Sequence, residues 1–195
     1  MTLLDDILEH NERFVENKDY EEFQTTKFPK KRIVILTCMD TRLIELLPKA
    51  MNLKNGDAKI IKSAGAIIAH PFGGIMRSIL VALYELGADE LYIIGHYDCG
   101  MSSVDVNHMK GSMNERGIDT ETFKMLEYSG IDLCDWLRGF DDVTESVIES
   151  VDAARNHPLM ADDIPIHGLV ADPDTGRLDV IVDGYKYLEE KKNEK

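Results

Sequence analysis

Two cysteines and one histidine are spaced so that they could bind a transition metal. Cys38 follows a short apolar run, and His96 and Cys99 follow a second such run as a His-x-x-Cys pair. Two thiolates and one imidazole suit zinc, and three protein ligands that leave a fourth position open are typical of a catalytic zinc site rather than a structural one. Taken singly, each residue could also be a buried cysteine or a hydrogen-bonded histidine without a metal.

Charged residues lie next to these candidate ligands. Asp40 and Arg42 follow Cys38 at intervals of two residues. Asp40 could ligate the metal, or Arg42 could hold Asp40 ionised as a hydrogen-bond acceptor for a metal-bound water. The pair could also be a helix N-terminal aspartate with a surface arginine. Asp98, inside the His-x-x-Cys pair, could accept a hydrogen bond beside the site or only form a turn.

The remaining cysteine and several histidines have weaker patterns. Cys134 has no metal ligand near it in the sequence and is predicted to lie in the core. Four histidines could shuttle protons in a zinc enzyme, but surface or structural roles are more typical, so we assign the shuttle to none of them. They are His70, His108, His157 and His167.

The segments around the candidate ligands predict an α/β fold with a central, mostly parallel sheet flanked by helices. Apolar runs of strand length occupy residues 32–37, 58–62 and 90–95. A helix that opens at Gly73 and closes at Gly87 makes a βαβ unit, which requires a parallel sheet and a right-handed crossover. The candidate ligands then lie at the carboxyl ends of parallel strands, where α/β proteins bind ligands. They converge if those two strands are neighbours.

The C-terminal half completes a single domain over residues 1–195. Residues 166–171 and 177–182 flank a turn and predict an antiparallel hairpin at the sheet edge. Several helices are expected between residues 102 and 154.

Both ends of the chain are predicted to lie outside the sheet and the helices that flank it. Residues 1–28 form an N-terminal helical arm, whose amphipathic helix over 3–17 is expected to pack on something outside its own sequence neighbourhood. Residues 189–195 form a charged tail.

Composition excludes several classes of protein. With Lys+Arg 22 against Asp+Glu 36, the net charge is −14, so the chain is not expected to bind nucleic acid. It has neither a membrane-spanning apolar stretch nor the basic start of a signal peptide. The odd, sparse set of three cysteines does not suit a disulfide framework. We therefore predict a cytoplasmic protein that does not enter membranes.

The motif Cys38-Met-Asp40-Thr-Arg42, followed by His96-Tyr-Asp-Cys99, resembles the Cys-x-Asp-x-Arg and His-x-x-Cys signature of the β-class carbonic anhydrases. The resemblance extends over roughly residues 32–182. It implies that Cys38, His96 and Cys99 bind one Zn²⁺ per chain, with Asp40 and Arg42 as the catalytic dyad beside the fourth position.

The resemblance also implies a reaction and a partner. The reaction is reversible hydration of CO₂ to bicarbonate and a proton through zinc-bound hydroxide, which Asp40 would orient. The partner is a second copy, in a homodimer or higher homo-oligomer with pockets at the subunit boundary. Ser63 stands where the family commonly has Asn. Ile35 stands where some members have the Trp of a regulatory bicarbonate site, so no such site is expected.

Two other functions stay open on the same site. One is hydrolysis of a CO₂ analogue, carbon disulfide or carbonyl sulfide. The other is a non-catalytic zinc-binding or sensor protein in which Asp40 closes the fourth position. Redox chemistry by Cys38 and Cys99 is disfavoured because the chain lacks a Cys-x-x-Cys pair.

Overall fold

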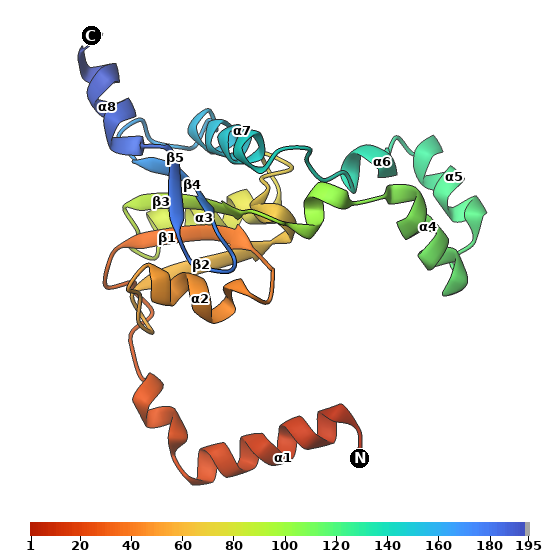
Figure 1. The fold of residues 1–195 in the computed structure, drawn as a ribbon, viewed down its shortest axis with the longest axis horizontal. Helices are drawn as coiled ribbons and strands as arrows, with labels where there is room; N and C mark the ends of the chain where they lie inside the picture. Colours follow the sequence, from red (N-terminus) through yellow and green to blue (C-terminus); the bar gives the residue numbers. More distant parts are fainter. Residues whose placement is uncertain (194–195) are drawn as a thin grey trace.

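The structure is a computed structural model and describes residues 1–193. Its centre is a five-stranded sheet in the order β2-β1-β3-β4-β5, in which only the last pair is antiparallel (Figure 1). The strands are β1 Ile33–Cys38, β2 Ala58–Ser63, β3 Glu90–His96, β4 Ile166–Ala171 and β5 Leu178–Val182. The α/β class, the mostly parallel sheet and the antiparallel edge hairpin predicted from the sequence are therefore confirmed.

Eight α-helices and three short 3₁₀ helices connect and flank the strands in the described part of the chain. The α-helices are α1 Leu3–Glu16, α2 Leu43–Ala50, α3 Gly74–Tyr84, α4 Val106–Glu115, α5 Thr120–Tyr128, α6 Leu133–Trp136, α7 Val143–Arg155 and α8 Gly184–Asn193. The 3₁₀ helices are η1 Asp19–Phe23, η2 Ala64–Ala66 and η3 Gly100–Ser103. No described helix combines the length and apolarity that crossing a membrane requires.

Strand β1 is buried over its whole length because helices cover both faces of the sheet. Val34 and Leu36 point to one face, where they join the core formed with α3 and α7. Ile33 and Ile35 point to the other face, where they join the core formed with α2. The alternation of side chains along a strand thus divides one apolar run between two cores.

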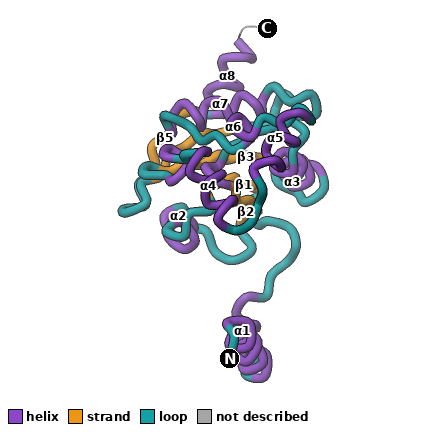
Figure 2. The backbone as a smooth tube through the Cα atoms, turned by 90° about the vertical axis from the view of Figure 1, so that its right-hand side faces the viewer, coloured by secondary structure: helices purple, strands orange, loops and turns teal. Residues whose placement is uncertain are grey.

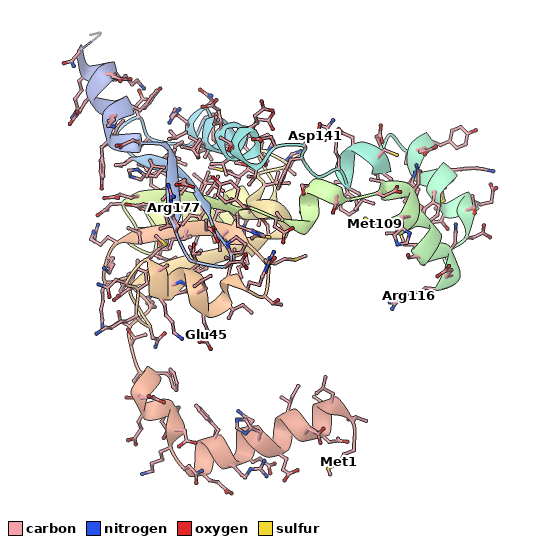
Figure 3. All side chains as sticks on the ribbon, viewed as in Figure 1. Met1, Glu45, Met109, Arg116, Asp141 and Arg177 are labelled. Atoms are coloured by element: carbon pink, nitrogen blue, oxygen red, sulfur yellow. The ribbon has the colours of Figure 1, made fainter. Side chains whose placement is uncertain are left out.

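Two helical segments lie outside this layered body. Helices α4, α5 and α6 project beyond the carboxyl ends of the strands (Figure 1). Helix α1 lies apart from the sheet at the end of a long connection (Figure 2), and its residues are not buried in the chain. The side chains along α1, which begins near the labelled Met1, extend into open space (Figure 3).

One sequence prediction is corrected by the structure. Cys134 is exposed rather than in the core, because it lies on the short helix α6 of the projecting segment. Residues 189–193 of the predicted charged tail lie in the last part of α8. Residues 194–195 of that predicted tail lie outside the described residues.

Candidate metal centre

The sheet brings the three predicted metal ligands to one edge. Cys38 is the last residue of β1, and His96 is the last residue of β3. These strands are parallel neighbours, so the adjacency on which the sequence argument depended is confirmed. Cys99 follows three residues after His96, immediately before η3. Both strands end at the same edge of the sheet. The turn after β3 therefore places Cys99 next to Cys38.

The three side chains are close enough to hold one metal ion. The sulfurs of Cys38 and Cys99 are 3.8 Å apart, and the ligand atoms of all three residues lie within 4.8 Å of one another. Two sulfurs that each lie about 2.3 Å from a tetrahedral zinc ion are about 3.8 Å apart. The sulfur separation therefore fits zinc without rearrangement.

A hydrogen bond at Nδ1 of His96 leaves its Nε2 atom available to bind a metal. His96 Nδ1 lies 2.8 Å from the carbonyl oxygen of Tyr97, and because a carbonyl only accepts, Nδ1 carries the proton. Nε2 then has a free lone pair. This buried atom has no hydrogen-bond partner within residues 1–193, and a buried polar atom without a partner is costly unless another group satisfies it. A metal ion between Nε2 and the two sulfurs would do so.

The two thiols share a proton. Their mutual hydrogen bond, opposed by burial, lowers the pKa of Cys38 to about 4. The same hydrogen bond, together with burial, raises the pKa of Cys99 well above its ordinary value. Burial works to lower the pKa of His96, but the adjacent Cys38 sulfur and the Tyr97 carbonyl outweigh it, so this pKa is raised. One thiol ionises readily, and a cation is needed to displace the second proton.

Arg42 holds the Asp40 carboxylate beside this cluster. Nη2 of Arg42 donates to Oδ2 at 2.9 Å, and Nε donates to Oδ1 at 3.1 Å. These hydrogen bonds, partly opposed by burial, lower the pKa of Asp40 to about 2, so the carboxylate is ionised at neutral pH. Asp40 Oδ2 also lies 3.7 Å from His96 Nε2. Of the arrangements that the sequence left open for Asp40 and Arg42, the structure contains the charge pair.

Gly65 is a part of the site for which the sequence predicted no role. Its φ of +69° is in the left-handed region, and a Cβ at this position would lie 3.0 Å from the Phe140 ring and 3.1 Å from Met101. This turn lets the backbone N–H of Gly65 reach the Cys38 sulfur and helps to lower the pKa of that thiol. The signal in the sequence was a glycine two residues after the end of a strand.

The four candidate shuttle histidines are divided between the surface and buried positions. His70 and His108 are exposed, whereas His157 and His167 are 3% and 6% exposed. His157 Nδ1 accepts a hydrogen bond from the backbone of Leu159. His167 is near the start of β4, at the opposite end of the strands from Cys38. The structure gives no reason to assign the proton shuttle to any of them.

A pocket of about 310 Å³ lies between the loop after Cys99 and helix α7. Its lining is rich in acidic side chains and does not include Cys38, Asp40, Arg42, His96 or Cys99. The pocket adjoins the candidate metal centre through Met101 and Phe140, which lie against Gly65. It is lined by Met101, Ser102, Val104, Arg138, Gly139, Phe140, Asp141, Asp142, Glu145, Ser146 and Glu149.

Comparison with known proteins identifies relatives of the chain in sequence. The family model for carbonic anhydrase matches residues 33–178. YtiB of Bacillus subtilis, provisionally named a carbonic anhydrase, is 58% identical over 185 residues, which cover 95% of this chain and 99% of YtiB. A carbon disulfide hydrolase of Acidithiobacillus thiooxidans is 30% identical over 156 residues, which cover 74% of this chain and 70% of that protein.

Solved structures include a similar fold. The crystal structure of β-carbonic anhydrase isoform I from Trichomonas vaginalis superposes with a TM-score of 0.86 at 36% identity, covering 95% of this chain and all of that one. Its class agrees with the Cys-x-Asp-x-Arg and His-x-x-Cys motifs, both of which lie inside the span matched by the family model. The chain therefore belongs to the carbonic anhydrase family, in its β class.

Proposed function

We propose that the protein catalyses the zinc-dependent, reversible hydration of carbon dioxide to bicarbonate and a proton. The observation that carries this proposal is the buried Cys38, His96 and Cys99 cluster beside a carboxylate that an arginine holds ionised. Cys38, His96 and Cys99 would hold one Zn²⁺ per chain. Bound zinc lowers the pKa of water toward about 7 and so supplies a nucleophile at neutral pH.

The roles of Asp40 and Arg42 follow from their geometry. An ionised carboxylate only accepts hydrogen bonds, so Asp40 would accept one from the attacking oxygen and orient a lone pair of that oxygen toward CO₂. Arg42 would fix the carboxylate through hydrogen bonds that include those from Nη2 at 2.9 Å and from Nε at 3.1 Å. Because the catalytic gain from orientation depends on holding the reacting atoms in place, the rigid charge pair is suited to this role.

The direct test is stopped-flow CO₂ hydration with a pH indicator, on protein of known zinc content, from about pH 6 to 9 so that the expected transition near pH 7 is crossed. We expect fast, zinc-dependent hydration that increases with pH. Absence of hydration by fully zinc-loaded protein over this range would contradict the proposal.

Hydrolysis of carbon disulfide is a second candidate function because a relative at 30% identity bears the name carbon disulfide hydrolase. The same cluster would serve this reaction, since CS₂ and carbonyl sulfide, like CO₂, have an electrophilic central carbon. The same protein preparation is given CS₂, and sulfide release is measured. Sulfide release without CO₂ hydration would favour this candidate.

A non-catalytic zinc-binding protein is the remaining alternative, with Asp40 closing the fourth position. The charge pair supports the open site, because Arg42 donates to both carboxylate oxygens of Asp40. Zinc-loaded protein that is inactive on CO₂ and CS₂, and whose metal does not exchange a bound water between about pH 6 and 9, would favour the closed alternative.

We further propose that the protein acts on its small-molecule substrate as a homodimer or higher homo-oligomer in the cytoplasm. Helix α1 supports the oligomer, since Leu4 and Leu8 on one side of this helix are 62% and 52% exposed. Apolar side chains repeated along one face of a helix usually pack against another surface.

A further inference from the structure

Arg42 joins the two loops that carry the candidate metal ligands. Its Nε and Nη2 groups donate to Asp40 in the loop after β1. Its Nη1 donates to Asp98 Oδ2 in the loop after β3, at 2.9 Å. Nη2 also donates to the main-chain carbonyl oxygen of Asp98 at 2.9 Å. The guanidinium is planar and rigid, so holding its Nη1 side fixes the direction in which Nε and Nη2 face Asp40.

The backbone of Asp98 is shaped for this contact. Its φ of +51° is in the left-handed region, which Asp and Asn tolerate better than most residues other than glycine. In this conformation both the carboxylate and the carbonyl oxygen of Asp98 face Arg42. The turn between His96 and Cys99 thus presents two acceptors to one guanidinium.

The exposure of the pair argues against a role in stability. The side chain of Asp98 is 84% exposed, and that of Arg42 is 37% exposed. Ion pairs at such positions contribute little to the free energy of unfolding, because water and salt screen the charges. The contact can still restrict orientation, since a hydrogen bond that adds little stability nevertheless limits the rotation of a side chain.

We propose that the Asp98 carboxylate is a positioning group, which holds the Arg42 guanidinium in the orientation that fixes Asp40 beside the metal centre. This inference rests on the proposed function for its effect on turnover. Its effect on the Arg42 side chain is independent of the reaction. Asp98 does not contact the metal ligands' side chains through any described hydrogen bond, so it acts through Arg42 and Asp40.

The chain contains a matched control for this contact. Arg32, just before β1, forms a two-point ion pair with Asp89, just before β3. This pair joins the same two strands at their opposite ends, and its side chains are 60% and 55% exposed. Removal of Asp89 therefore tests whether any exposed link between β1 and β3 affects the site.

Three variants separate the contributions of Asp98. Asp98→Gly removes the carboxylate but accepts the left-handed backbone, so the turn is preserved. Asp98→Asn keeps an oxygen acceptor for Nη1 and also tolerates this φ. Asp89→Gly is the control. For each zinc-loaded protein, the zinc stoichiometry, kcat and KM for CO₂ hydration, and the ¹⁵N–¹H signals of the Arg42 guanidinium are measured.

We expect Asp98→Gly to lower kcat about 10-fold, the lower end of the loss typical for groups that support metal-site residues. Zinc stoichiometry and KM should stay near the wild-type values, and the Arg42 guanidinium signals should broaden through faster rotation and exchange. Asp98→Asn should retain most of kcat and sharp Arg42 signals. Asp89→Gly should resemble the wild type in every measurement.

Three results would overturn the inference. They are wild-type kcat and unchanged Arg42 signals in Asp98→Gly, equal losses in Asp98→Gly and Asp89→Gly, or an Asp98→Asn variant as impaired as Asp98→Gly. If zinc-loaded wild type acts on neither CO₂ nor CS₂, the proposed function fails. The Arg42 signals of the same variants then still decide whether Asp98 positions the guanidinium.

Discussion

At Cys38, a thiolate is the group that zinc requires, and the hydroxyl of serine does not replace it at neutral pH. We therefore expect Cys38→Ser to lower the zinc content from about one ion per chain to near zero, and to abolish CO₂ hydration. Zinc is measured by elemental analysis after dialysis against metal-free buffer.

The control for this prediction is Cys134→Ser, because Cys134 is exposed and lies on the projecting helix α6. It should retain zinc and activity. Full zinc retention by Cys38→Ser would show that Cys38 is not a ligand.

Asp40 has a role that can be separated from metal binding. In Asp40→Asn the side chain keeps its shape but loses the charge and gains donors, so it no longer acts only as an acceptor. We expect full zinc content and a loss of roughly 10- to 100-fold in kcat for CO₂ hydration, measured by stopped flow.

Glu45→Gln is a matched control for Asp40→Asn, since it also converts an acid to an amide, in the exposed Glu45–Lys49 pair on α2. Its turnover should equal that of the wild type. Unchanged turnover in Asp40→Asn would remove Asp40 from the mechanism.

Residue types and spacing predicted more of the site than of its surroundings. Cys38, His96 and Cys99 were predictable because few pairs of motifs combine two thiols and an imidazole after strands. The contact between Arg42 and Asp98 was not, because it depends on two loops that meet only in the folded sheet. Cys134 was predicted wrongly because the weak periodicity around it did not reveal a segment that projects from the body.

At the scale of elements, His167 on β4 contacts the start of α8. Its Nδ1 accepts a hydrogen bond from the backbone N–H of Gly184, the first residue of α8, at 3.2 Å. Burial lowers the pKa of His167, with Glu90 and Asp183 acting in the opposite direction. The ring also lies between Tyr92 and Tyr185, with centroids 4.6 and 4.7 Å away.

This lowered pKa predicts a pH dependence of stability. Below the ordinary histidine pKa of about 6.5, His167 binds a proton in the unfolded chain. In the folded chain it stays neutral until the pH falls to its lower pKa. The contribution of His167 is therefore fully present above that pH and is lost as the pH falls toward the lower pKa of the folded state. Urea unfolding of wild type and His167→Gln at pH 7.5 and 5.5 tests this. The slopes of the free energy of unfolding against pH should differ between the two proteins by less than about 1.4 kcal/mol per pH unit.

Other groups also titrate in this range, so the comparison needs an exposed histidine as a control. His108→Gln on α4 should keep the pH dependence of the wild type, whereas His167→Gln should flatten it. Equal pH dependence in all three proteins would exclude His167 as the source.

The elements differ in how well their patterns predicted them. The buried parallel strands were predicted within about a residue because both faces require apolar side chains. Helix α8 was interpreted in part as a charged tail because its sequence has few apolar residues. It is held by contacts that the pattern does not reveal, namely the Arg155 guanidinium 3.8 Å from the centre of the Tyr187 ring and the Lys191–Asp162 ion pair at 3.0 Å.

At the scale of the whole molecule, the order of the strands was the step that the sequence left open. The βαβ pattern predicts a parallel sheet, but it does not say that β1 lies between β2 and β3. That order depends on which faces α2, α3 and α7 cover, and so on packing between segments far apart in the chain. The position of α1 is likewise absent from local patterns.

The exposed face of α1 predicts self-association of the chain. Leu4, Ile7 and Leu8 are spaced to lie on one side of the helix, and they are 62%, 55% and 52% exposed. The helix is separated from the body by a long connection (Figure 2), which would let it reach a second copy. We therefore expect light scattering to give at least twice the mass of one chain.

The double variant Leu4→Asp/Leu8→Asp should weaken association by about 100-fold or more, since each buried leucine contributes roughly 1.5–3 kcal/mol. Asp6→Asn, on the opposite side of α1, should leave the mass unchanged, and a wild-type mass of one chain would mean that α1 does not pair with a second copy.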